Sequence, residues 1–567
     1  MLIDRNKICR LVLVCLLLFI TCDVLSQRVE RTIVDWQPTH YSVAVALNDS
    51  LTEISAVTDI DLQVLNGGLS RLEVQFGDLS VDSIKTGATN LSFERKPGLI
   101  VISLPKSPMK GSKMRVSISY HGIPKDGLIL TKDKDGIQSA TGDNWPDRVH
   151  NWIPCIDHPS AKASVTFTIN APERDYAVAN GRLVSRQTNS DKTVTWTYDE
   201  KAPIPPYCMV IAVDNFDVSG PPSRKSLSYL VPHSDHELAG EFAPSEQMLD
   251  YFSELIAPYP YEKLALIVGA TQFGGMENSG AIVFPSNFLR RNGDETLTKA
   301  FKIPMHVEET TAHEIAHQWF GDSVTESTWA DLWLNEGFAT YFAGLFLERY
   351  EGREIFNEYM RRQKEVYLGY EKQHPSPIHD TQTTDLFRLL NANNYQKGAW
   401  VLHMLRGMLG DEKFFEGLRI YYRDHMNSNA SSDDLRFALE KASGRNLKQF
   451  FDRWVYGEGH PVFDVVWSTK TEGGRNFLSL EINQVQHNAP FLMPLTILVK
   501  TDRGEFRKTI DLTGKSVQGE FPIDGKAVEV TVDPDAFLLA ETTVRHQRLQ
   551  NRLCGVRVPD SVDCHLP

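Results

Sequence analysis

Two histidines and two glutamates in the middle of the chain have the spacing of a catalytic metal site. His313 and His317 belong to an H-E-x-x-H pattern. On a helix, residues four apart lie on the same face, so both imidazoles can bind one ion. Catalytic zinc has three protein ligands and leaves a fourth position for water. Glu336, after 18 intervening residues, is the expected third ligand, and Glu314 is expected beside that water as its base.

The alternative interpretation is that both histidines are ordinary solvated or core residues of an amphipathic helix. The surroundings of Glu336 argue against it. This residue lies in the segment WLNEGFA, where an unpaired carboxylate among Trp, Leu and Phe would be costly to bury. Zinc supplies a partner for that charge. We therefore expect one Zn²⁺ per chain, with His313, His317 and Glu336 as its ligands.

A glycine-rich segment precedes the histidines and reads FGGMEN over 273–278. Glycines allow close approach of a ligand to the backbone, and an extended edge beside them can pair with a peptide main chain. A simple turn at Gly274 and Gly275 is the plainer interpretation. Near a zinc site, however, Glu277 could hold the α-ammonium group of a peptide, with Met276 and Asn278 beside it.

Tyr395 opens a predicted helix in the segment YQKGA. A tyrosine hydroxyl directed at a scissile carbonyl would stabilise the oxyanion that forms there. Considered alone, a tyrosine at this position is more often a core or surface aromatic residue.

The elements that must position these residues are mainly helices. Periodic apolar residues predict a helix over 238–256, then short strands over 263–270 and 281–284. The following predicted helices cover 305–320, 331–350, 354–368, 394–409, 412–425, 432–442 and 447–455. The interval between His317 and Glu336 fits a stop at Gly321, a loop and a second, roughly antiparallel helix. This organisation is the one expected of a thermolysin-like metalloprotease domain.

Alternating apolar residues predict strands on both sides of the helical region. Before it, strands are expected at 41–47, 99–104, 114–120, 163–169 and 193–198. After it, they are expected at 463–467, 478–484, 493–500, 506–511 and 527–532. The fold class is therefore α+β with several domains: an all-β domain at 27–235, a zinc catalytic domain at 236–457, a small β-sandwich at 458–540 and a tail at 541–567.

The N-terminus has the pattern of a secretory signal peptide, with basic residues, an apolar run over 11–20 and small residues before a cleavage point after Ser26. A membrane anchor or a lipoprotein at Cys22 are alternatives; the apolar run is short for a bilayer. We expect a secreted or periplasmic protein without a transmembrane segment after cleavage. Cys554 and Cys564 are expected to pair, and the state of Cys155 and Cys208 stays open.

The net charge of −14 argues against nucleic acid and anionic membranes as partners. It is compatible with substrates that carry a free ammonium group.

Together, these segments resemble the gluzincin aminopeptidases, the family that includes aminopeptidase N and leukotriene hydrolase. The resemblance extends over the mature chain and rests on GGMEN, on HEIAH with Glu336 in WLNEGFA, on YQKGA, and on WIPCIDHP at 152–159. It implies a saddle-shaped β-domain, a thermolysin-like catalytic domain and a β-sandwich.

The resemblance also implies roles for individual residues. His313, His317 and Glu336 would bind zinc, Glu314 would be the general base, and Tyr395 would stabilise the tetrahedral intermediate. Substrate contacts would come from Gly274, Gly275, Met276, Glu277 and Asn278, with Glu277 binding the free amino group.

Three features depart from the family pattern. The long helical C-terminal domain of many members is not found after the sandwich, so we expect a more open cleft. The second ammonium-binding residue is not obvious in the β-domain; Asp143 is a substitute. The acid that the epoxide-hydrolysing member has eight residues before its tyrosine is Phe387 here, which disfavours that activity.

The sequence thus predicts a zinc aminopeptidase acting on peptides with a free N-terminus. A thermolysin-type zinc endopeptidase shares the three ligands, and Glu277 distinguishes the two. A non-catalytic, peptide-binding relative is the third interpretation. It would be expected to have lost ligands or base, and this chain has all of them.

Overall fold

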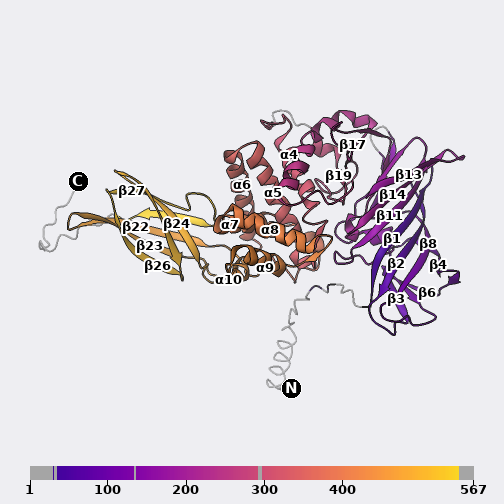
Figure 1. Ribbon diagram of the computed structural model, residues 1–567, viewed down its shortest axis with the longest axis horizontal. Helices are drawn as coiled ribbons and strands as arrows, with labels where there is room; N and C mark the ends of the chain where they lie inside the picture. Colours follow the sequence, from indigo (N-terminus) through magenta and orange to yellow (C-terminus); the bar gives the residue numbers. More distant parts are fainter. Residues whose placement is uncertain (1–27, 29, 31–34, 133–135, 291–295, 548–567) are drawn as a thin grey trace, which may run out of the picture. The chain divides into compact units, whose positions relative to one another are not determined.

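The strands predicted in the first third of the chain form three antiparallel or mixed sheets. In the computed structural model the described residues are 28, 30, 35–132, 136–290 and 296–547. Contacts divide the chain into two units, 1–458 and 459–567. The largest sheet has the order β13 (Arg182–Thr188), β14 (Thr193–Ile204), β11 (Ala163–Pro172), β1 (Trp36–Leu47), β2 (Ile54–Val64), β8 (Lys113–Gly122), β4 (Ser80–Thr86) and β5 (Thr89–Asn90) (Figure 1).

Apolar and polar residues alternate along these strands, which explains why they form a sheet with one buried face. In β1, Tyr41, Val43 and Val45 are buried, while the residues between them are more accessible. Two smaller sheets share this core. One has the order β12 (Tyr176–Ala179), β15 (Ile211–Asp214), β10 (Gln138–Gly142), β9 (Leu128–Lys132), and the other β3 (Arg71–Gln75), β7 (Leu99–Ser103), β6 (Phe93–Lys96).

A four-stranded sheet contains strands from both sides of residue 236, the boundary predicted between the first two domains. Its order is β16 (Phe216–Ser219), β17 (Leu227–Pro232), β18 (Leu264–Val268) and β19 (Ala281–Phe284). The strands β17, β18 and β19 run parallel, and all residues of β18 and β19 are buried. Continuous apolar sequences suit such strands because both faces are covered.

The helical region follows the predicted pattern closely. The helices are α4 (Met305–His317), α5 (Trp333–Tyr350), α6 (Arg353–Glu371), α7 (Gly398–Leu409), α8 (Asp411–His425), α9 (Ser432–Ser443) and α10 (Lys448–Trp454). Every residue of α5 from Trp333 to Leu347 is buried, so α5 is the central helix of this region. Helix α4 packs against α5 and begins after Pro304, which suits the first turn of a helix.

Two predicted helices differ in detail. The expected helix over 238–256 is divided into a 3₁₀ segment, His233–Phe242, and α2 (Ser245–Leu255), because Gly240 and Pro244 interrupt the helical pattern. The helix expected over 394–409 begins with a π-helical turn, Asn393–Lys397. The segment 273–278 is a loop with one bridge to β19, between Met276 and Val283, rather than a strand.

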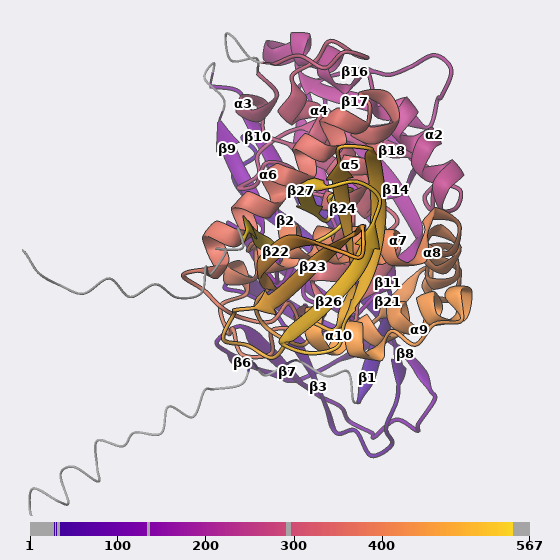
Figure 2. The ribbon, with the colours of Figure 1, turned by 90° about the vertical axis from the view of Figure 1, so that its left-hand side faces the viewer.

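The C-terminal unit contains two facing sheets, as predicted. One has the order β26 (Ser516–Ile523), β23 (Arg475–Gln484), β22 (Val462–Glu472), β28 (Glu541–His546), and the other β25 (Gly504–Leu512), β24 (Met493–Thr501), β27 (Ala527–Val532). Figure 2 shows β22, β23 and β26 as neighbouring strands of one sheet. Strands β26 and β28 were not predicted from the sequence.

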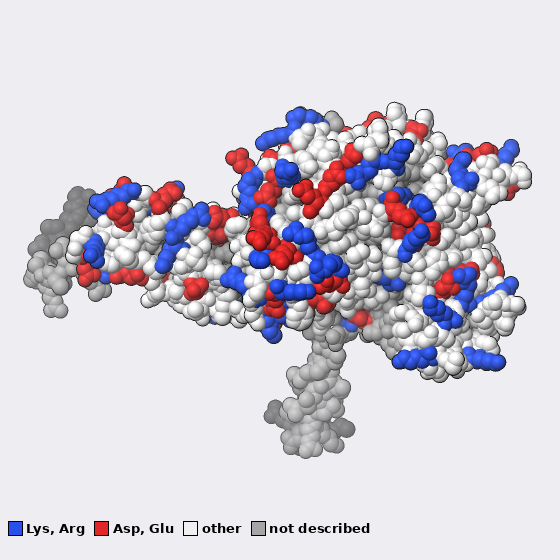
Figure 3. Space-filling model, in the orientation of Figure 1, with Lys and Arg blue, Asp and Glu red and all other residues white. Residues whose placement is uncertain are grey.

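The structure shows whether two of the cysteines form a disulfide. Cys155 and Cys208 are both buried, and neither forms a disulfide. The predicted signal peptide and the predicted Cys554–Cys564 pair lie outside the described residues. In the part of the chain that the structure describes, no helix has the length and apolar character needed to span a membrane. On the face shown in Figure 3, acidic and basic side chains are intermixed.

Candidate metal centre and peptide-binding cavity

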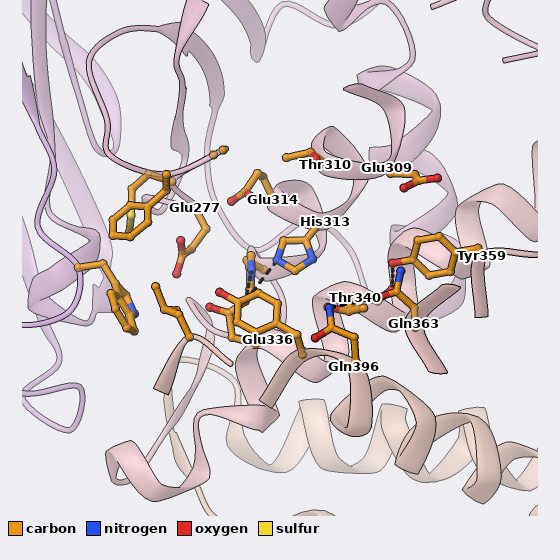
Figure 4. A pocket seen from close by; sticks show the side chains of 18 residues that line it. Glu277, Glu309, Thr310, His313, Glu314, Glu336, Thr340, Tyr359, Gln363 and Gln396 are labelled. Atoms are coloured by element: carbon orange, nitrogen blue, oxygen red, sulfur yellow. Dashed lines mark hydrogen bonds and ion pairs between the residues drawn. The ribbon is translucent and has the colours of Figure 1, made fainter. Parts of the chain in front are cut away.

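Helices α4 and α5 bring the three predicted metal ligands together. His313 and His317 are on α4, and Glu336 is in the first turn of α5. The Nε2 atom of His313 lies 3.3 Å from Oε2 of Glu336, and Nε2 of His317 lies 3.5 Å from the same oxygen. One ligand atom from each residue falls within 4.8 Å of the other two. The side chains therefore converge on one point, as Figure 4 shows for His313 and Glu336.

The donor set fits zinc. His317 donates its Nδ1 proton to the carbonyl of Phe320, at 3.2 Å, so Nε2 is the nitrogen that can bind a metal once it has lost its proton. Two imidazoles and one carboxylate form a ligand set of catalytic zinc enzymes. The ligand atoms of a second group, made of Glu277, Glu314 and His317, also lie within 4.8 Å of one another. We assign the metal to His313, His317 and Glu336, because Glu336 is the carboxylate that stays ionised.

The pKa values of these carboxylates support that distinction. Burial raises the pKa of Glu336, but hydrogen bonds from His313 and His317 outweigh it and lower the pKa to about 2. Burial raises the pKa of Glu277 and raises that of Glu314 well above the ordinary range; the charge of His317 opposes both shifts. A divalent cation among these groups would lower both values, since it would be the largest local charge.

The backbone of Gly275 lies directly against the side chain of Glu314. A Cβ atom at Gly275 would fall 2.5 Å from the Glu314 carboxyl carbon, closer than real Cβ contacts allow. At Gly274 the nearest atom to such a Cβ is on Phe288, at 3.7 Å. Both glycines line the cavity. At Gly275, the absent side chain makes room for the predicted base.

Glu277 lies at the back of the cavity, and Gln318 fixes its backbone. Glu277 is 5% exposed, and its Oε1 atom has no hydrogen-bond partner. The side chain of Gln318 donates to the Glu277 carbonyl at 2.7 Å and accepts from the Gly280 amide at 2.8 Å. Asp322 accepts a further hydrogen bond from Gln318 at 2.9 Å. The loop that carries Glu277 is thereby attached to the end of α4.

Tyr395 lies in the π-helical turn before α7. Its ring stacks on His313 with centroids 5.9 Å apart and planes 3° from parallel. Burial raises the pKa of Tyr395 well above its ordinary value, so the hydroxyl keeps its proton and can donate. The end of the turn lies close to α5. A Cβ atom on Gly337, in α5, would lie 2.9 Å from the backbone of Gly398, the first residue of α7. π-Helical turns of this kind are frequent at functional sites.

Except for Asn278 and Asp143, the predicted residues line one cavity, together with several residues that were not predicted from the sequence. The cavity has a volume of about 340 Å³. Gly274, Gly275, Met276, Glu277, Glu314 and Tyr395 line it together with the metal-binding residues; Asn278 is fully buried beside them. Residues not predicted from the sequence are Trp145, Phe273, Glu309, Thr310, Thr340, Tyr359, Gln363, Leu390 and Gln396. Phe273, Glu309, Thr310, Thr340 and Gln396 lie on the same elements as the predicted residues, and the one-turn spacing of Glu309 from His313 and of Thr340 from Glu336 could have indicated them. Trp145, Tyr359, Gln363 and Leu390 come from other segments, which no local pattern connects to the site.

Asp143 is not among the lining residues. It is fully buried, forms a 2.8 Å ion pair with Arg148 and accepts a hydrogen bond from Thr271. Both carboxylate oxygens therefore already have partners, and the second ammonium-binding residue proposed from the sequence is not supported at this position.

Two protein-family descriptions match most of the described chain. Residues 241–454 match the family described as "Peptidase family M1 domain", and residues 37–208 match "Peptidase M1 N-terminal domain". The chain is 28% identical over 487 residues to "Probable aminopeptidase 1" of Sulfurisphaera tokodaii. The aligned region covers 82% of this chain and 59% of that protein.

Two other similar proteins come from distant organisms. The "Tricorn protease-interacting factor F2" of Thermoplasma acidophilum is 26% identical, over 75% of this chain and 55% of that protein. Human "Glutamyl aminopeptidase" is 30% identical, over 57% of this chain and 34% of that protein. The chain thus spans between a third and three fifths of the length of these curated relatives.

Proposed function

Since the chain belongs to the M1 peptidase family, we propose that it is a zinc aminopeptidase that hydrolyses the first peptide bond of substrates with a free N-terminus. The observation that carries this proposal is the Oε1 atom of Glu277, which is buried without a partner in the cavity of the metal-binding residues. An unpartnered buried carboxylate oxygen is costly, and a substrate ammonium group would supply the partner. Such an anchor selects the first residue of a chain.

The proposed mechanism assigns one task to each residue. Glu277 binds the α-ammonium group and so places the first carbonyl next to His313, His317 and Glu336. Zinc held by these three residues would polarise that carbonyl and lower the pKa of water. Glu314 takes the proton from the attacking water and gives it to the leaving amine. Tyr395 donates a hydrogen bond to the oxyanion.

Paired substrates and variants test this proposal. The purified chain should contain one zinc and hydrolyse an aminoacyl arylamide, and its N-acetylated counterpart should react at least about a hundredfold more slowly. Glu314→Gln should retain zinc but lose turnover by several orders of magnitude. Glu277→Ala should reduce kcat/KM for the free substrate while zinc content stays unchanged. Near-normal turnover of Glu314→Gln would refute the assignment of the base.

The two alternatives give different results in the same assays. A thermolysin-type endopeptidase would cleave N-blocked peptides internally and would be insensitive to Glu277→Ala. A non-catalytic relative would bind peptides without hydrolysing any of them. Glu277, in the cavity of the candidate ligands, favours the exopeptidase over the endopeptidase, and the retained ligands and base favour it over the non-catalytic relative.

We also propose that the protein acts outside the cytoplasm, after cleavage of the predicted signal peptide. The supporting observation is the order of basic, apolar and small residues over 1–26. N-terminal sequencing of the protein from the culture medium or periplasm should begin at Gln27. Full-length protein recovered from the cytoplasm would contradict the proposal.

A further inference from the structure

The two ends of the cavity differ in chemistry. In Figure 4, Glu277 lies on one side of the metal-binding residues, and Tyr359 and Gln363 lie on the other. The far end is polar: Gln396 donates a hydrogen bond to Gln363 at 3.2 Å, and Glu309 pairs with Arg362. A peptide anchored by Glu277 has its first side chain at the Glu277 end. The remainder of the peptide extends toward the polar end.

The Glu277 end of the cavity is apolar. Phe273 and Met276 belong to the same loop as Glu277, and Trp145 and Leu390 line the same cavity. The ring of Trp145 meets that of Phe273 edge to face, with centroids 5.9 Å apart. These contiguous aromatic and aliphatic side chains form the wall nearest the expected position of the first side chain.

Contacts behind this wall hold it in place. Trp145 is only 2% exposed and also packs edge-on against Trp329 and Phe387, with centroids 5.8 and 5.9 Å away. Asp143 accepts a hydrogen bond from Thr271 at 3.0 Å, which ties the segment of Trp145 to the loop of Phe273. A pocket fixed in this way binds an apolar group without first paying to order its own side chains.

Charges in and around the cavity disfavour ionised first side chains. Of the carboxylates that line the cavity, Glu277 and Glu314 lie nearest the apolar wall, and their negative charge opposes entry of another carboxylate. The guanidinium of Arg148 already lies over the rings of Phe273 and Phe387, at 6.0 and 5.7 Å from their centroids. Arg148 is paired with Asp126 and Asp143, and it already occupies the aromatic faces that a cationic first side chain would need for a cation–π contact.

From this arrangement we propose that the enzyme preferentially removes aromatic and large aliphatic first residues, and that Trp145, Phe273, Met276 and Leu390 determine this preference. The inference rests on the proposed aminopeptidase function and specifies its substrate class. Burial of the first side chain against these residues favours the reaction in proportion to the apolar area removed from water.

A panel of arylamides with different first residues tests the preference in the zinc-loaded, full-length chain. We expect kcat/KM for Phe, Leu and Met to exceed that for Ala about tenfold, and those for Glu and Arg about a hundredfold. If no aminoacyl arylamide is hydrolysed although zinc is bound, the proposed function itself fails. If Glu, Arg or Ala is hydrolysed as well as Phe, the aminopeptidase function stands and the specificity inference is wrong.

A charge introduced into the apolar wall tests its location. Leu390 is partly exposed, so Leu390→Arg can be accommodated, and Thr384→Arg is a matched control on an exposed site of the same segment. We expect Leu390→Arg to raise the Glu-to-Phe ratio of kcat/KM at least about tenfold, because the new guanidinium pairs with an acidic first side chain. Thr384→Arg should leave that ratio within about twofold of the parent. Equal ratios in the two variants, or a uniform loss on every substrate in Leu390→Arg, would overturn the inference.

Discussion

The position of the predicted base, Glu314, depends on the absence of a Cβ atom at Gly275. The carboxyl group of Glu314 occupies the space that any Cβ would fill. A glycine in a cavity wall is usually explained by the ligand that approaches it. Here the atoms that approach the glycine belong to Glu314 of the same protein. The glycine therefore sets the distance between the loop that carries Glu277 and α4.

We therefore predict that Gly275→Ala lowers kcat about a hundredfold with zinc still bound, because a base displaced by about 1 Å loses about that factor. Steady-state kinetics together with metal analysis will measure both quantities. Gly274→Ala is the comparison variant, since its Cβ has room, and it should lose much less activity. Equal losses in the two variants would show that the contact with Glu314 is unimportant.

A second prediction at this scale concerns metal affinity and pH. In the metal-free chain, burial lowers the pKa of His317, but the hydrogen bond and charge of Glu336 outweigh it and raise the pKa to about 10. Zinc needs the neutral imidazole, so binding must release that proton. The apparent affinity of the apoprotein for zinc should rise about tenfold per pH unit between pH 6 and 8. Calorimetry in buffers of different ionisation enthalpy should detect about one proton released; none would contradict the raised pKa.

The residues that could be predicted from the sequence are those with local spacing. His313 and His317 are one helical turn apart, and Glu336 lies in an apolar segment that needs a partner for its charge. Trp145 and Leu390 join the same cavity from remote segments, so no spacing identifies them. Asp143 was a plausible acid near the expected region, but its ion pair with Arg148 is a tertiary contact that the sequence does not reveal.

Among the elements, the attachment of the Glu277 loop to α4 depends on one side chain. Gln318 pairs with the Glu277 carbonyl and the Gly280 amide at once, which a carboxylate or an apolar residue of similar size cannot do. This contact would make recognition of the substrate ammonium sensitive to a residue that does not touch the substrate. Gln318 is thus a positioning residue.

We predict that Gln318→Leu retains zinc and raises KM for a free aminoacyl substrate about tenfold, because two buried backbone groups lose their partner and the loop shifts. The ratio of kcat/KM between free and N-acetylated substrates should fall. A merely structural defect would lower both activities alike and leave the ratio unchanged. Gln373→Leu, on an exposed site near the end of α6, serves as the control.

Element types were predictable where periodicity is strong, and less so where it is interrupted. The buried helix α5 and the alternating strand β1 agree with their predicted segments. The π-helical turn at Tyr395 was not predicted; it packs closely against Gly337 of α5, a tertiary contact that the sequence does not show. Strand β28 pairs with β22 across a long interval of sequence, and its exposed residues carry no alternation.

For the molecule as a whole, the division into two units predicts how it unfolds. All metal-binding residues belong to the unit 1–458, and the sandwich unit begins at Gly459. A ligand stabilises only the unit that binds it. We expect scanning calorimetry to show two transitions, with chelation of zinc lowering the melting temperature of the larger one by several degrees. The transition of the sandwich should not move; an equal shift of both would indicate one cooperative unit.

Within unit 1, the ammonium group of Lys162, which lies just before β11, binds deep in the catalytic region. It donates to the carbonyls of Asp322 and Ser323 and to the hydroxyl of Thr325, at 2.7–2.9 Å. These oxygens follow directly after the metal-binding helix. A truncated protein that starts at residue 236 would lack Lys162 and would expose these oxygens to water. The β-sheet region is thus joined to the helical region by this contact, and residues 35–458 are the smallest piece that keeps both sides of it.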